Sequence, residues 1–240
     1  MIIQNRTING AFKKRLNRFE GIVVIDDKEE LVHIPNTGRC RELLVEGATV
    51  ILEIREKPNR KTPYELIMVY KGDMLISIDS QAPNKIVEEA VRSGAIKEFR
   101  GYPYVKREAV YGNSRFDLML KRNEHSSEAD SCFIEVKGVT LESGGVAKFP
   151  DAPTERGAKH VNELVKARKN GYRAAVVFLI QMEAVTFFRP NWVMDEDFSK
   201  ALSNAHKDGV EVYAYNCIVA KGEVVLKAGI PVDLIDRRSN

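Results

Sequence analysis

In the first 80 positions of the chain, apolar and polar residues alternate in short runs that turn residues separate. Such runs, rich in β-branched and aromatic residues and bounded by Gly, Pro, Asn and Asp, are typical of β-strands. The predicted strands are Gly10–Phe19, Gly21–Ile25, Leu31–Ile34, Thr49–Arg55, Tyr64–Tyr70 and Met74–Ser77. The turns between them are Asp26–Lys28, Pro35–Gly38, Lys57–Arg60 and Lys71–Asp73. This succession of short strands predicts a small barrel of the oligonucleotide-binding (OB) type.

Near residue 80 the pattern changes. The polar segment Asp79–Asn84 predicts a linker, and the apolar residues within Ile86–Val91 predict an amphipathic helix that ends at Gly94. Further predicted strands are Tyr104–Tyr111, Arg115–Lys121, Cys132–Val139, Ala174–Ile180 and Val210–Ala214, and further predicted helices are Thr154–Lys169 and Glu196–Lys207. We expect Arg122–Asp130 to be an exposed connector and Glu142–Pro153 to be a loop. The pattern predicts an α+β two-domain protein: a barrel in residues 1–80 and an α/β domain with a mixed sheet in residues 81–240.

Composition agrees with a folded, water-soluble chain: 240 residues, 44% hydrophobic and 30% charged. The chain contains no run of 18 apolar residues, so we predict no membrane-spanning segment. The N-terminus lacks the apolar stretch of a signal peptide. The three cysteines (Cys40, Cys132 and Cys217) are far apart and form neither metal-ligand spacing nor a disulfide framework. We therefore expect a cytoplasmic protein with no membrane partner.

Net charge is only +3, but positive charge gathers at the start of the chain. Residues 1–18 carry no acid and five basic residues, namely Arg6, Lys13, Lys14, Arg15 and Arg18. Such a segment can contact nucleic-acid phosphates. It can equally be the solvated edge of a sheet, where lysine discourages aggregation.

Candidate chemistry lies in two predicted strands of the second half. Asp117 interrupts an apolar run, and Glu135 and Lys137 are two residues apart, so their side chains leave the same face of a strand. If the strands are neighbours, two carboxylates and one ammonium meet at the rim of a buried sheet. Two carboxylates can hold Mg²⁺ or Mn²⁺, and a lysine beside the ion can orient water. The pattern resembles the Asp…Glu-x-Lys signature of restriction-endonuclease-like nucleases; otherwise Asp117 is a solvated acid and Glu135–Lys137 an ordinary ion pair.

Other charged residues could complete such a site. Thr154 is a candidate cap for the helix that follows it, and Arg156, Lys159 and His160 come next; they could contact phosphate, and His160 could ligate metal. The nuclease resemblance also implies an acid on the first helix of the α/β half, where Glu88 and Glu89 stand. The alternative for each helix is a solvated, charged surface.

The segment His33–Glu42 contains Pro35 and Gly38, which predict a tight turn that exposes Arg39 and Arg41. This turn is either a phosphate-contacting loop or a barrel loop with incidental charge.

Four strings together resemble the sugar fermentation stimulation protein A family: His33–Cys40, Tyr111–Asp117, Glu135–Thr140 and Phe149–Gly157. The resemblance covers nearly the whole chain. It implies an OB-type barrel, a nuclease-like domain, largely non-specific DNA binding and a regulatory link to sugar use. Where we expect Cys-Pro and Pro-Asp, the chain has Ile34-Pro35 and Phe116-Asp117. The second departure is tolerable, because proline carries no catalytic group.

We therefore predict a DNA-binding protein with a metal-dependent nuclease-like site. Asp117, Glu135 and Lys137 are its predicted catalytic residues, and Asp117, Glu135, the Val136 carbonyl and Glu89 its predicted ligands for Mg²⁺ or Mn²⁺. The predicted DNA contacts are Lys13, Lys14, Arg15, Arg18, Arg39, Arg41, Arg156 and Lys159. The alternative is a non-catalytic DNA-binding regulator of sugar (maltose) metabolism genes, and a homodimer is left open.

Overall fold

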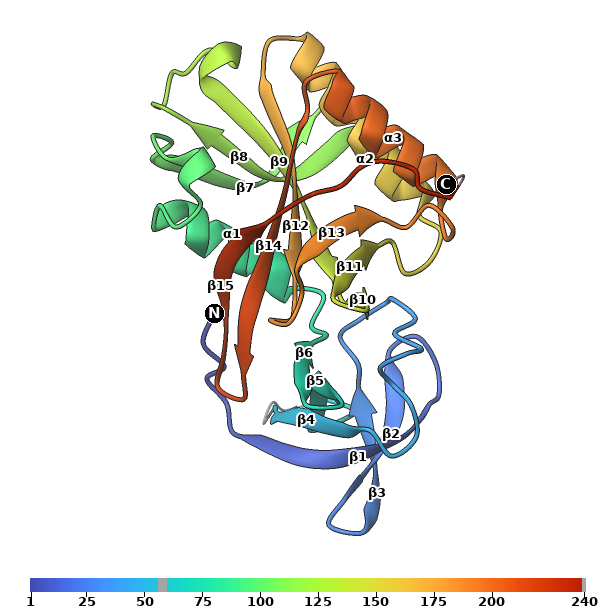
Figure 1. Cartoon of the computed structure of the whole chain (residues 1–240). Coiled ribbons are helices and arrows are strands. Elements are labelled where there is room, and N and C mark those ends of the chain that lie inside the picture. The colour runs from blue at the N-terminus through green and yellow to red at the C-terminus, as the bar shows by residue number, and fades with distance from the viewer. Residues whose placement is uncertain (56–59, 239–240) are drawn as a thin grey trace.

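The computed structural model describes residues 1–55 and 60–238, and its first six strands close into a barrel (Figure 1). These strands are β1 (Thr7–Arg15), β2 (Glu20–Ile25), β3 (Lys28–His33), β4 (Thr49–Ile54), β5 (Tyr64–Lys71) and β6 (Met74–Ser77). They are ordered β3-β2-β1-β4-β5-β6, and a pairing of His33 with Glu65 joins β3 to β5. This closure leaves few free strand edges, as expected of an OB barrel. The predicted turn at 57–59 lies outside the described residues.

A second six-stranded sheet, ordered β15-β14-β12-β9-β8-β7, dominates the rest of the chain. Its strands are β7 (Tyr104–Tyr111), β8 (Ser114–Lys121), β9 (Ser131–Val139), β12 (Arg173–Ile180), β14 (Glu211–Ala220) and β15 (Glu223–Ile230). The sheet is mixed, because β12 runs parallel to both β9 and β14 while the other pairs are antiparallel. The predicted α+β two-domain class, with a barrel followed by a mixed sheet, is confirmed.

Helices cover both faces of this sheet (Figure 1). They are α1 (Ala82–Arg92), α2 (Glu155–Lys169) and α3 (Glu196–Lys207), and two short 3₁₀ turns lie at Lys97–Phe99 and Glu128–Asp130. Apolar residues of α1 join one buried cluster, and those of α2 and α3 join the other. Strand β12 lies between these clusters, and its residues 174–180 are fully buried, as the continuous apolar run predicts. Among the described residues, no helix is long and apolar enough to cross a membrane.

Two predictions of local structure were wrong. Helix α1 begins at Ala82, inside the predicted linker, because Pro83 falls in its first turn, where proline costs no helical hydrogen bond. The predicted loop Glu142–Pro153 contains β10 (Leu141–Ser143) and β11 (Val146–Phe149). Strand β11 pairs in parallel with β13 (Phe187–Pro190), which was not predicted, nor was β15. These strands were not predicted because the segments that pair are far apart in the chain or strongly polar.

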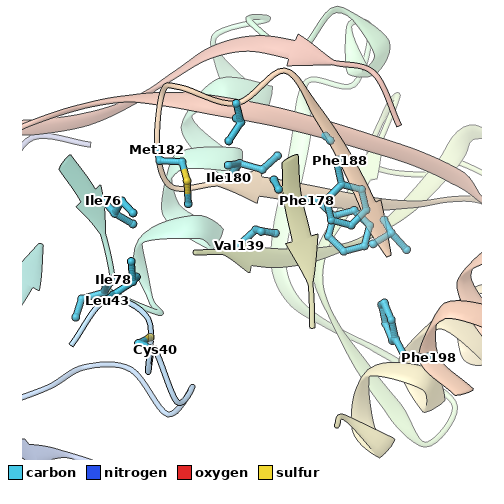
Figure 2. Packing of buried hydrophobic residues seen from close by; sticks show 14 of the residues in the cluster. Cys40, Leu43, Ile76, Ile78, Val139, Phe178, Ile180, Met182, Phe188 and Phe198 are labelled. Atoms are coloured by element: carbon cyan, nitrogen blue, oxygen red, sulfur yellow. The ribbon is translucent and has the colours of Figure 1, made fainter. Parts of the chain in front are cut away.

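The barrel and the α/β body share one apolar core (Figure 2). Leu43 and Ile76 of the barrel lie in the same buried cluster as Val139 and Ile180, and the cluster continues to Phe198 on α3. A shared core of this kind fixes the two bodies against each other. Surfaces that combine residues of both bodies can therefore be treated as pre-formed.

Candidate functional site

The site begins where strands β8 and β9 part. Their regular antiparallel pairing reaches Leu118 and Ile134 and goes no further toward Asp117. Two residues beyond Ile134 on β9, the N–H of Val136 donates to Oδ2 of Asp117 at 2.8 Å. An aspartate side chain thus replaces a strand partner, so its carboxylate lies against the peptide that links Glu135 to Val136.

Asp117 is held in a largely buried position. Asn84, in the first turn of α1, donates to its Oδ1 at 2.7 Å. Burial, and then the charge of Glu135, raise the pKa of Asp117 above its ordinary value, although the Val136 N–H and Lys137 oppose them. Asn84 was not predicted, because a single asparagine near a helix start carries no distinctive sequence signal.

Glu135 is the most enclosed charged group of the site, only 3% exposed. Its Oε1 accepts hydrogen bonds from Lys137 Nζ and from His160 Nδ1, each at 2.6 Å. Burial by itself would raise the pKa of Glu135, but the His160 hydrogen bond and the Lys137 charge outweigh it and lower that pKa. Its Oε2 is buried without a hydrogen-bond partner, which is costly for a carboxylate.

Helix α2 supplies His160 from its first two turns. Thr154 caps the helix, as predicted, by accepting the Gly157 N–H on its hydroxyl at 3.1 Å. Arg156 Nε donates to His160 Nε2 at 3.4 Å, which leaves the Nδ1 hydrogen to face Glu135. His160 therefore orients the carboxylate, and the chain Arg156–His160–Glu135 ties the helix start to β9.

The donor set fits a hard divalent cation. A buried carboxylate oxygen lacks a partner, and a second carboxylate with a raised pKa lies beside it. Within residues 1–55 and 60–238, no three His, Cys, Asp or Glu side chains gather around one point. Mg²⁺ is commonly held by one or two carboxylates together with water and substrate phosphate, so a third acidic ligand is not required.

The structure does not bring Glu89 into this cluster. Its carboxylate lies 2.9 Å from the Met1 amino group and its side chain is 49% exposed. Glu88 is bound to Arg92 and Arg107 instead. Glu89 is five residues after Asn84 in α1 and therefore leaves the helix on another side, so it does not complete the predicted metal site. Glu88, four residues after Asn84, shares its side of the helix, but its carboxylate is held by the two arginines.

Two of the predicted DNA-contacting residues have other partners. The guanidinium of Arg15 donates to five backbone carbonyls at 2.6–3.1 Å: those of Asn17, Arg18, Asn36, Gly38 and Arg39. Lys13 is paired with Glu29 across the barrel surface. Arg15 therefore holds the 36–39 loop in place and has no donor left for phosphate, which corrects its predicted role.

The remaining arginines border an open cavity. Arg18, Arg39 and Arg41 line a hollow of about 750 Å³ on the barrel. Ala152 and Pro153 of the α/β body also line it. Arg156 lines an adjoining cavity that shares several of these residues. Lys14 and Lys159 are exposed. The sequence thus identified most of a basic lining, but not that the lining continues into a cavity that Arg156 borders.

Comparisons with known proteins agree with both bodies. Residues 14–78 match the family model "SfsA N-terminal OB domain", and residues 81–223 match "Sugar fermentation stimulation protein RE domain". A sugar fermentation stimulation protein homolog of Caldanaerobacter subterraneus subsp. tengcongensis is 55% identical over 98% of the chain and all of the relative. The homolog of Clostridium tetani is 50% identical over the same shares. The structure of Pyrococcus furiosus SfsA in complex with Ca²⁺ superposes with a TM-score of 0.87 at 29% identity, covering 97% of this chain and 98% of that one.

Proposed function

Because the chain belongs to the sugar fermentation stimulation protein family, we propose that it is a DNA-binding nuclease that hydrolyses phosphodiester bonds with Mg²⁺ or Mn²⁺. One observation carries the proposal: the buried, unpartnered Oε2 of Glu135 beside the carboxylate of Asp117. Structural acids in a core normally have all their oxygens paired. An oxygen left free next to a second carboxylate is what a cation site requires.

Asp117, Glu135 and the Val136 carbonyl are the proposed ligands. When bound, the ion supplies Lewis-acid polarisation of the phosphate and a more acidic water. The Ca²⁺ in the Pyrococcus furiosus relative supports a divalent cation in this family. Ca²⁺ and Mg²⁺ share oxygen ligands, but Mg²⁺ needs fewer of them, as this donor set provides.

The chain's other residues have distinct roles. Lys137 forms an ion pair with Glu135 and can orient the attacking water or neutralise a phosphate oxygen. His160 fixes the rotamer of Glu135, so that Oε2 stays directed away from Lys137. Lys137 therefore acts on the substrate, whereas His160 acts by positioning the Glu135 carboxylate.

The barrel provides DNA affinity through charge. Arg18, Arg39 and Arg41 are exposed and, among the described residues, have no carboxylate within ion-pair distance. Unpaired arginines bind backbone phosphate without reading sequence, so we expect largely non-specific binding.

A cleavage assay tests this function. Duplex, single-stranded and branched DNA are incubated with Mg²⁺, with Mn²⁺ and with EDTA. Wild type should cut at least one substrate only with a divalent ion, and Glu135→Gln should abolish cutting. Glu89→Gln is the matched control and should cut like wild type, because Glu89 lies at the surface against Met1. DNA binding without cleavage under every condition would contradict the nuclease and favour a binding-only regulator.

A further inference from the structure

A cavity of about 500 Å³ lies between the barrel and the α/β body, directly beside the candidate site. Its walls come from the barrel loop at 36–38, from the 149–154 segment, and from Gly138, which follows Lys137 on β9. Arg156, which contacts His160, also lines it. The cavity is in the size range of small-ligand pockets and continues into the basic hollow of the barrel.

The buried part of the cavity is built to accept hydrogen bonds. Gln181 is 1% exposed, and its Nε2 donates to the Ser77 carbonyl at 2.7 Å. Because that carbonyl can only accept, the amide orientation is fixed, and Oε1 is left buried without a partner. This Oε1 lies near Gly138, where a Cβ would be 3.7 Å away. A ligand in this cavity should therefore present an N–H donor.

The outer part of the cavity carries charged side chains, unlike its buried part. Arg18 and Arg156 are both exposed, whereas the carboxylate of Asp151 lines the cavity and accepts the Arg39 N–H at 3.0 Å. Asp151 and Gln181 disfavour a phosphate inside, and the two arginines favour one at the entrance. Phe149, with the adjacent Pro150, adds apolar surface to the wall. A nucleotide has this combination: a flat base with N–H donors and a phosphate outside.

We propose that the cavity takes one unpaired nucleotide of the DNA strand, so that the substrates are single-stranded, flapped or frayed DNA and not intact duplex. The proposal rests on the proposed function, since the cavity wall includes Gly138, the residue that follows Lys137 on β9. A base in a duplex must be unstacked and unpaired before it can enter the pocket, whereas an unpaired base enters without that cost. The strand then continues along Arg18, Arg39 and Arg41.

The walls are held in place without ligand. The shared apolar core fixes the barrel against β9 and β12 (Figure 2). Asn36 donates to the Ile78 carbonyl at 2.7 Å, which holds the 36–38 loop within the barrel, and Asp151 accepts the Arg39 N–H across the junction. Binding a nucleotide therefore needs little ordering of the protein.

The test measures binding of three fluorescent DNA probes of one sequence: a single strand, a blunt duplex and the duplex with a single-stranded overhang. EDTA is present so that cleavage plays no part. Ser80→Trp puts an indole at the exposed rim of the cavity, away from the basic hollow, and Gln181→Met removes the unpartnered acceptor. Thr49→Trp is the matched control, since Thr49 is exposed on β4 and lines none of these cavities.

Wild type should bind the single strand and the overhang more tightly than the blunt duplex. Both cavity variants should lower affinity for the unpaired probes about tenfold, the size of one stacked base, and spare the blunt duplex. Thr49→Trp should match wild type. If Gln181→Met does not fold, Ser80→Trp alone decides. If the cavity variants show the same ratios of affinity between the three probes as wild type, the cavity proposal is overturned but the proposed function is not. If wild type binds none of the probes, the proposed function is overturned as well.

Discussion

The carboxylate of Glu135 on β9 and the imidazole of His160 on α2 are joined by a 2.6 Å hydrogen bond in the buried interior. This bond fixes which oxygen of Glu135 remains free. Partners that orient a metal-binding carboxylate commonly contribute about 10–100-fold to affinity or activity. His160→Gln should therefore weaken Mn²⁺ binding by about that factor, as measured by calorimetry. His125→Gln, in the exposed β8–β9 connector, is the control; equal affinity in both variants would show that His160 has no positioning role.

Lys137→Ala should separate binding from turnover. The lysine is not a proposed metal ligand, and we propose that the arginines of the barrel supply most DNA affinity, so the affinities for Mn²⁺ and for DNA should both stay near wild type. Loss of charge stabilisation in the transition state should lower kcat about 10²–10³-fold. Single-turnover cleavage with Mn²⁺ measures this effect.

The control for Lys137→Ala is Lys200→Ala, on the exposed side of α3, where the lysine pairs with Glu196. Turnover should be unchanged there. Cleavage by Lys137→Ala at the wild-type rate would mean that the activity arises from another site or another protein.

Arg15 and Arg39 lie close together but should respond oppositely to substitution. Arg15→Ala removes five hydrogen bonds to backbone carbonyls and should lower the free energy of unfolding by about 1–3 kcal/mol in urea titrations. Arg39→Ala should change that free energy by less than about 0.5 kcal/mol. It should instead reduce the slope of log affinity for duplex against log salt by about 0.9, the loss of one phosphate contact.

Lys166→Ala, on the exposed part of α2, is the control for the salt slope. If Arg39→Ala leaves the slope of log affinity against log salt unchanged, the barrel hollow is not part of the DNA interface.

The pair Arg173–Glu211 should make stability depend on pH. Partial burial alone would raise the pKa of Glu211, but hydrogen bonds from Arg173 at 2.7 and 2.8 Å and from Tyr213 outweigh it and lower that pKa. A lowered pKa stabilises the folded state above the unfolded pKa of about 4.3 and loses that effect as pH falls through the folded value.

Glu211→Gln should accordingly cost about 1–2 kcal/mol at neutral pH, since the pair is partly exposed, and the difference from wild type should shrink below about pH 4. Urea titrations across pH measure it, with the exposed Glu128→Gln as control. A difference that stays constant down to pH 3 would show that Glu211 is not stabilised as its carboxylate.

The grouping of Glu135 with Lys137 was predictable because strand alternation is a local property. Glu135 and Lys137 share a face by spacing alone, and the apolar residues around Asp117 indicated a buried strand. The barrel was predictable for the same reason, since each of its strands pairs with a neighbour only a short turn away. The fold class therefore followed from patterns that span a few residues.

The errors in the candidate site involve contacts that spacing does not determine. Arg15 was assigned to DNA because its five carbonyl partners lie in a loop that only the folded barrel brings near. Glu89 was assigned to metal, although the rotation of α1 presents Asn84 to Asp117. Gln181, at the end of β12, had no sequence signal, because its importance comes from an oxygen left unpaired at the junction of two bodies.

A crystal grown with Mn²⁺ tests the central claim most directly. Anomalous scattering should show one Mn²⁺ contacting Asp117, Oε2 of Glu135 and the Val136 carbonyl, and Asp117→Ala should remove the peak. Mn²⁺ bound only elsewhere, or no peak at saturating Mn²⁺ with Glu135 Oε2 still unpartnered, would contradict the proposal that these carboxylates form a divalent-cation site.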